Sequence, residues 1–302
     1  MTHELTQIAL EHALSTHSRL FARYSLSDIE QALDSIPASE PYHHVAQEVS
    51  RMWGEARESF GDEGRDVLLR ATLLWLITRF KIRAERQRFT DEILQRFKLS
   101  MDRITLLAQQ QSPKEYVGIS DLYLKDLAIC RQQMFPAGAQ VVEQDSGFHR
   151  TLMFRGGLKQ GFAFAEFLLR HGGAHRHYYQ IHTHLLETED FNPEGWDACY
   201  LRIADMLAIN PEVRGMWGGS WFYDPALADI SPNLSYLRER PLSSGAVLYF
   251  SEVSIESGAL AKSQTRKTFY EKGRYIPKSY ALIWPRGAML NWAERFRRES
   301  RK

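Results

Sequence analysis

The spacing of apolar residues divides the chain into a helical first part and a mixed second part. Up to about residue 112, apolar positions recur at three- and four-residue steps, the spacing of a helix that packs one face on a core. The clearest stripes are Leu68, Leu69, Leu73, Leu76, Ile77 and Phe80, then Ile93, Leu94, Phe97, Leu99, Met101, Ile104 and Leu107. Polar residues and a proline end this pattern at Gln109-Gln110-Gln111-Ser112-Pro113. We therefore expect a helical domain over 1–112 and a second domain over 113–302.

Beyond residue 113, helical patterns alternate with short strand patterns. We expect helices over 121–133, 161–169, 193–209 and 258–272, and strands over 175–185, 213–223, 246–253 and 279–284. Segments 140–143 and 150–154 flank Asp145-Ser146-Gly147 and predict a hairpin. Asn192-Pro193-Glu194 predicts a helix start, because it supplies an N-cap side chain, a first-turn proline and a carboxylate. The predicted fold class is α+β, a mixed sheet flanked by helices and preceded by an all-helical N-terminal domain.

Composition and charge narrow the classes of function. With 44% hydrophobic and 25% charged residues, the chain matches a globular domain protein, and its net charge of +1 gives no field to attract nucleic acid or an acidic membrane. The most apolar run, 68–77, contains Arg70 and is about half the length that a bilayer requires. Two cysteines without C-x-x-C spacing, Cys130 and Cys199, favour a reducing cytoplasm and buried thiols. We expect a cytoplasmic protein that binds neither nucleic acid nor membranes.

Histidines gather around the strand predicted at 175–185. Five of the 11 histidines lie there: His171, His175, His177, His182 and His184. Residues two apart share a strand face, so each of the pairs His175/His177 and His182/His184 can present two imidazoles together. A bulge near Gln180 would bring all four to one side, and imidazole is a common ligand of zinc and iron. One interpretation is thus a metal-dependent enzyme, and the other is a polar strand end with hydrogen-bonded histidines.

The second half resembles the GCN5-related N-acetyltransferase (GNAT) superfamily over residues 140–285. The resemblance is carried by Thr268-Phe269-Tyr270-Glu271-Lys272-Gly273-Arg274-Tyr275 followed by the strand Tyr280-Ala281-Leu282-Ile283-Trp284. The strand, helix and strand between His175 and Tyr223 are similar to the family's central strand, cofactor helix and splayed neighbour. The junction expected to bind pyrophosphate is Glu187-Thr188-Glu189-Asp190-Phe191-Asn192-Pro193, which has three carboxylates and no glycine.

This resemblance implies an acyltransferase that moves an acyl group from a thioester donor to a small amine. The donor expected is acyl-CoA or an acyl carrier protein. His182 or His184 is then the candidate base, since a histidine titrates near neutral pH, and Tyr270 matches the family's general acid. On the late helix, Ser263 and Arg266 are candidates for binding the cofactor.

An aromatic segment beside two glycines is the candidate wall of the substrate cleft. Glycines in a strand let a ligand approach the backbone closely. The candidate substrate-binding residues are Trp217, Ser220, Trp221, Tyr223 and Asp224. A third interpretation is a non-catalytic binding or regulatory protein, which the acidic junction at 187–190 favours.

Overall fold

The computed structural model describes residues 2–80, 88–110, 113–172, 177–256, 258–261 and 263–300. It consists of two compact units, Met1–Ala137 with His184–Glu187, and Gly138–Thr183 with Thr188–Lys302. The boundary falls after Ala137 and not at residue 112, because α7 (Asp121–Cys130) and β1 (Met134–Pro136) pack against helices of the first unit.

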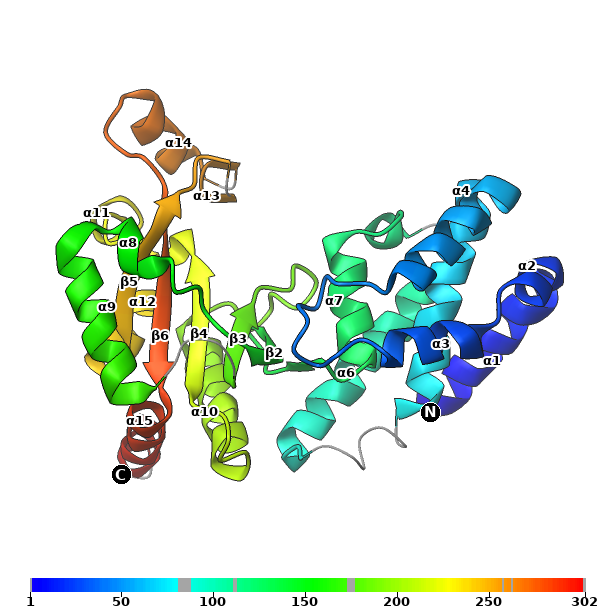
Figure 1. Cartoon of the computed structure of the whole chain (residues 1–302), viewed down its shortest axis with the longest axis horizontal. Coiled ribbons are helices and arrows are strands. Elements are labelled where there is room, and N and C mark those ends of the chain that lie inside the picture. The colour runs from blue at the N-terminus through cyan, green and yellow to red at the C-terminus, as the bar shows by residue number, and fades with distance from the viewer. Residues whose placement is uncertain are drawn as a thin grey trace. The chain divides into compact units, whose positions relative to one another are not determined.

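The first unit is built almost entirely of helices, as expected (Figure 1). Besides α7 and β1, it contains α1 (Thr2–Thr16), α2 (Ser18–Arg23), α3 (Leu26–Asp34), α4 (Gln47–Thr78), α6 (Asp91–Ala108) and the 3-10 turn η1 (Lys114–Tyr116). Gly61 has a φ of +73° and divides α4 into two helical parts. The predicted stripe on the second part is confirmed, since Leu68, Leu69, Leu73 and Leu76 are fully buried.

The second unit mixes helices and strands. Its elements are β2 (Val141–Ser146), α8 (Leu152–Arg155), α9 (Gly157–His171), β3 (Tyr178–His182), α10 (Pro193–Ile209), β4 (Gly215–Ser220), η2 (Trp221–Tyr223), α11 (Leu227–Ile230), η3 (Pro232–Leu234), α12 (Tyr236–Ser243), β5 (Val247–Val253), α13 (Gly258–Ala261), α14 (Gln264–Glu271), β6 (Lys278–Pro285) and α15 (Arg286–Glu299). The fold is thus a mixed sheet flanked by helices, as predicted.

Several predicted elements differ from the observed ones, among them the strand predicted over 175–185, which ends at His182. The hairpin prediction was wrong, because 152–155 is the helical turn α8 and β2 pairs with β3 instead. The predicted 258–272 helix is divided into α13 and α14, since Ser263 takes an extended conformation and caps α14. The strand predicted over 213–223 ends at Ser220, whose hydroxyl accepts a hydrogen bond from the Phe222 backbone and starts η2.

The strands of this unit lie in the order β2-β3-β4-β6-β5 (Figure 1). Neighbours are antiparallel except β3 and β4, which are parallel and joined through α10. One face packs against α8 and α9 through an aromatic core containing Phe148, Phe164, Phe167, Tyr178 and Tyr249. On the other face, Trp284 of β6 packs against Tyr200 of α10 and Trp292 of α15. The sheet is therefore covered on both sides, as parallel pairing usually requires.

The pairing of β3 with β4 covers three residues and then stops. It joins Tyr178 to Gly215, Tyr179 to Met216 and Gln180 to Trp217. Beyond this point β3 stays paired with β2 up to His182, and β4 stays paired with β6 up to Ser220. The sheet therefore opens between the carboxyl ends of its two parallel strands, where ligands commonly bind in α/β sheets.

The structure also describes the surroundings of the two cysteines and the length of the apolar helices. Both Cys130 and Cys199 are buried, as predicted. Within the described ranges, no helix has the length and apolar character needed to cross a bilayer.

Gly218 sits where the two parallel strands separate, and we predict that it cannot be replaced by alanine without loss of stability. A Cβ there would lie 2.7 Å from Ile181 Cγ1 and 3.0 Å from the Tyr223 hydroxyl. Overpacking of this kind costs about 1–3 kcal/mol. We expect Gly218→Ala to lower the unfolding free energy measured in urea. The matched control is Gly219→Ala, whose Cβ would meet only Trp217 at 3.6 Å; equal stability of the two variants would contradict the prediction.

Candidate active site

A histidine–carboxylate pair lies at the end of β3. The Nε2 atom of His182 is 3.1 Å from Oε2 of Glu143 on β2, and the Glu143 side chain is almost fully buried. The antiparallel register explains the contact: His182 lies opposite Val141, so Glu143 is its diagonal neighbour on the same face. A buried carboxylate beside an imidazole fixes the orientation of the ring.

A cleft lies on the same face of the sheet. The cleft has a volume of about 210 Å³. Strands β4, β5 and β6 form one side of it, and α8 with the residues before it forms the other. The lining residues are Trp217, Gly219, Ser251, Glu252, Ser279 and Ala281 on the strands, and His149, Thr151, Leu152 and Arg155 opposite them. His182 is not in this lining. Because Gln180 pairs with Trp217, continuing the register places His182 level with Gly219. The dyad and the cleft thus share one face at the opening between β3 and β4.

A buried arginine lies beyond the end of β4. Arg266 of α14 is 6% exposed, and its guanidinium carbon lies 4.5 Å from the ring centre of Trp221. Its Nε donates to the Ala259 carbonyl and its Nη1 to the Ser231 hydroxyl. Burial lowers the pKa of Arg266, and among the described side chains no carboxylate forms an ion pair with it. The structure thus brings two predicted site residues together, with the guanidinium of Arg266 stacked on the ring of Trp221.

The remaining predicted binding residues have structural partners. Ser263 caps α14 by accepting a hydrogen bond from the Arg266 backbone. Asp224 is buried and accepts bonds from the Ala226 and Lys278 backbone N–H groups. Tyr223 is fully buried, and burial raises its pKa above the ordinary value. Of the predicted wall, therefore, Trp217 alone lines the cleft, because the chain turns into η2 after Ser220.

His184, the second candidate base, lies in a different setting from His182. It belongs to the tetrapeptide His184–Glu187 of the first unit and is 1% exposed. Its Nε2 contacts Asp126 Oδ1 at 3.1 Å, and its Nδ1 accepts a hydrogen bond from the Leu186 backbone at 3.3 Å. Both ring nitrogens are therefore engaged within the protein. This arrangement suits a structural role and leaves no ring nitrogen for a substrate.

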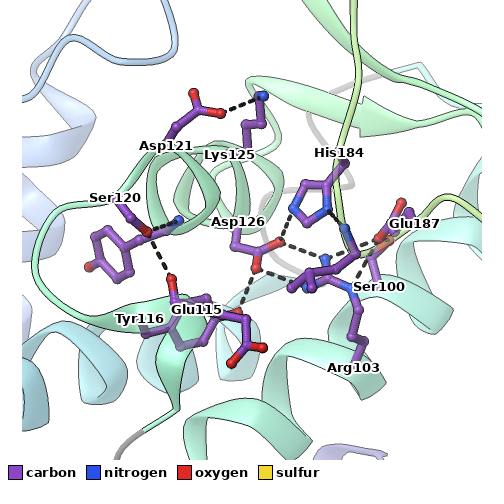
Figure 2. Close-up of polar contacts among 12 residues, drawn as sticks. Ser100, Arg103, Glu115, Tyr116, Ser120, Asp121, Lys125, Asp126, His184 and Glu187 are labelled. Carbon is purple, nitrogen blue, oxygen red and sulfur yellow. Dashed lines mark hydrogen bonds and ion pairs between the residues drawn. The ribbon is translucent and has the colours of Figure 1, made fainter. Parts of the chain in front are cut away.

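Asp126 is the centre of the network that holds His184 (Figure 2). Arg103 donates to both of its oxygens, at 2.6 and 2.9 Å, and the Tyr116 hydroxyl donates at 2.5 Å. Burial alone would raise the pKa of Asp126, but the hydrogen bonds from Arg103 and His184 outweigh it and lower that pKa to about 2. Asp126 and Arg103 were not predicted from the sequence, although a charged pair within apolar helical stripes is a usable signal.

The acidic junction after β3 is partly explained by the same network. Glu187 accepts hydrogen bonds from Ser100 at 2.6 Å and from Arg103 at 3.0 Å (Figure 2). Asn192 caps α10 by accepting from the Gly195 backbone at 2.8 Å. The carboxylate of Glu187 is thus neutralised by an internal cation, and its role is to fix the chain after β3.

The expected four-histidine arrangement is not supported. His175 lies outside the described residues, and the side chain of His177 faces Asp145, with its Nδ1 3.5 Å from Oδ1. The expected bulge near Gln180 lies on the opposite strand, between Glu143 and Ser146 of β2. In the part of the chain that the structure describes, no three His, Cys, Asp or Glu side chains are placed to hold a metal ion.

Tyr270 lies on the last turn of α14, in the connection between β5 and β6. Its side chain is partly exposed, and it is absent from the lining of the 210 Å³ cleft. The geometry therefore gathers His182, Glu143 and Trp217 on one sheet face, and Arg266 and Trp221 beyond its edge. Tyr270 follows Arg266 by one turn of α14, but within the described ranges its side chain forms no hydrogen bond or aromatic contact with any residue of either group.

A larger cavity of about 590 Å³ lies in the helical unit. Its walls come mainly from α1, α4 and α6 and are divided equally between apolar and polar residues, with His12, His17, Glu63 and Arg70 among the polar ones. Arg70 donates to the Gln110 carbonyl at 2.7 Å. We place the candidate active site in the second unit despite the smaller cleft, because a carboxylate-oriented histidine lies on that sheet face.

No family model, curated protein or solved structure matches this chain. The candidate site therefore rests on its geometry.

We predict that protonation of Asp126 destabilises the protein in acid. Its pKa of about 2 lies below the ordinary value, so the unfolded chain takes up the proton first as the pH falls. The stabilisation is fully present above about pH 4 and is lost as the pH falls towards about 2, and it amounts to about 2 kcal/mol.

Urea unfolding at a series of pH values measures this effect. Asp126→Asn should be less stable at neutral pH, because Arg103 and His184 lose a shared carboxylate, and should lose less further stability below about pH 4. The same acid dependence in the variant and the wild type would contradict the assignment.

Proposed function

We propose that this chain is an acyltransferase that moves an acyl group from a thioester donor to a small amine, with His182 as the general base. The observation that carries the proposal is the His182–Glu143 pair at the opening between β3 and β4. The order of strand, helix, parallel strand over 178–220 agrees with the GNAT resemblance of the sequence, and it supports a GNAT-like assignment for the second unit.

The chemistry that the residues support is a single displacement. His182 accepts the proton of the amine as the amine nitrogen attacks the thioester carbonyl carbon. Glu143 stabilises the imidazolium that forms, as in other histidine–carboxylate pairs. The C–N bond forms, the C–S bond breaks, and the sulfur leaves as a thiolate that takes up a proton. The resemblance gives that last proton to Tyr270, and this role rests on the resemblance alone.

The cleft beside the dyad suits a small polar acceptor. Its lining includes the hydroxyl residues Thr151, Ser251 and Ser279 and the carboxylate of Glu252. Arg155 donates to the Ser251 carbonyl and lies 3.5 Å from Glu252. Hydroxyl and carboxylate groups bind ammonium and amine nitrogens, so the acceptor proposed is an amine that fits within about 210 Å³.

Arg266 is the proposed contact for the anionic part of the donor. A desolvated guanidinium without a carboxylate partner is costly, and a bound phosphate or carboxylate would offset this cost. Thioester donors on coenzyme A and on carrier proteins share a phosphate on their pantetheine arm. The Arg266 site therefore agrees with either donor.

We predict that His182→Gln lowers kcat for acyl transfer about 10²- to 10⁴-fold, with a smaller loss for Glu143→Gln. Transfer from a panel of acyl thioesters to small amines, followed by release of the free thiol, measures this. The matched control is His177→Gln, a half-exposed histidine that precedes β3, which should retain activity. Full activity of a folded His182→Gln variant would remove the proposed base.

Arg266 gives a separate prediction for the donor. Loss of a charged hydrogen bond costs about 1.5–3 kcal/mol, so Arg266→Gln should raise the KM of the donor about 10- to 100-fold and leave that of the amine unchanged. Arg266→Lys should have a donor KM between those of the wild type and Arg266→Gln, because lysine keeps the charge but lacks the planar guanidinium. The exposed neighbour Lys267 supplies the control, Lys267→Gln. An unchanged donor KM in all three variants would exclude Arg266 from donor binding.

A further inference from the structure

Four large apolar side chains stand exposed along α8 and α9. Leu158, Phe162 and Leu169 of α9 are 84%, 76% and 88% exposed, and Phe154 of α8 is 79% exposed. They exceed every other exposed large apolar residue in the described ranges. At 100° per residue, the three on α9 fall within about 40° of one another around the helix axis. We call these four residues the α9 stripe.

The other side of α9 already packs against the sheet. Phe164 and Phe167 are buried in the aromatic core with Tyr249 of β5, and Figure 1 shows α9 alongside β5. The helix is therefore apolar on two opposite sides, a pattern found in helices that are covered on both. Large apolar side chains exposed together on one side of a helix are typical of an interaction site.

The charged residues beside the stripe can form ion pairs with the same residues of a second copy when the two α9 helices are antiparallel. Lys159 and Glu166 are seven residues apart, so they lie on the same flank of α9, and both are exposed. When two copies of one helix pack antiparallel about a two-fold axis, equivalent flanks face each other. Lys159 of each copy then faces Glu166 of the other. The axis passes close to Phe162, midway between the two charged positions.

The side chains beside the stripe allow close approach. Gly161 and Ala165 lie on the flank opposite the charges, where small side chains let two helix backbones come together. Covering the four side chains of the stripe removes on the order of 500 Å² per copy, or about 1,000 Å² in total, near the lower limit for a specific interface.

We propose that the α9 stripe is a homodimer interface in which α9 packs antiparallel on α9 of a second copy. Phe162 lies at the two-fold axis, and Lys159 forms reciprocal ion pairs with Glu166. The proposal is independent of the acyltransferase assignment, since none of these residues lines the cleft or belongs to the His182–Glu143 pair.

Sedimentation velocity of the full chain over a range of concentrations tests the interface. The wild type should pass from monomer to dimer, and Phe162→Glu should weaken the dimer at least tenfold. Leu99→Glu is the matched control, because Leu99 is 60% exposed but lies on α6 of the first unit and is not one of the four residues of the stripe. A wild type that is monomeric at all concentrations, or a dimer that Phe162→Glu does not weaken, would overturn the proposal.

A charge exchange tests the antiparallel orientation. Lys159→Glu and Glu166→Lys should each weaken the dimer, because each places like charges opposite one another. The double variant should recover most of the wild-type affinity, since it restores both reciprocal pairs. Circular dichroism checks that α9 remains folded, since Glu166 also pairs with Arg170 within the helix. A double variant weaker than either single one would overturn the proposed orientation.

Discussion

The arrangement of the second unit depends on the short parallel pairing between β3 and β4. Three residue pairs hold the strands together, and each strand then follows its outer neighbour. On the α10 side, Ile181 approaches Gly218 so closely that only glycine fits there. On the α9 side, the β3–β4 register continued beyond its last pair brings His182 level with Gly219, which lines the cleft. The short β3–β4 pairing therefore has two results. The α10 face of the opening is closely packed, and the α9 face carries the His182–Glu143 pair and the cleft.

Two histidines separated by a single residue have different roles because their surroundings differ. His182 meets one buried carboxylate at the end of a strand, whereas His184 is enclosed by Asp126 and the Leu186 backbone. Asp126 in turn is held by Arg103 and Tyr116, so His184 completes a buried polar network in the helical unit. A buried polar network stabilises the fold only when each of its polar groups has a hydrogen-bond partner. This requirement explains why His184 has no nitrogen left for catalysis, and why Glu187 is bound to Arg103.

Local patterns predicted much of the fold and less of the site. The stripe at 68–77 and the cap at Asn192 were correct because both depend on neighbours within one helix. In the 91–107 helix, Ile93, Phe97, Met101 and Ile104 are buried, but Leu94 and Leu99 are exposed since they lie off that face. The site required pairs distant in sequence. Glu143 lies 39 residues from His182, and only the β2–β3 register brings them together. The α9 stripe was missed because exposed and buried positions on that helix are equally apolar.

The proposed site can be tested by a crystal structure of the chain with a donor analogue in which a methylene group replaces the thioester sulfur. We predict that the acyl carbonyl lies at the carboxyl ends of β3 and β4, on the face that carries His182, with the anionic group of the analogue at Arg266. An analogue bound in the α1–α4–α6 cavity of the helical unit, or on the α10 face of the sheet, would contradict this prediction.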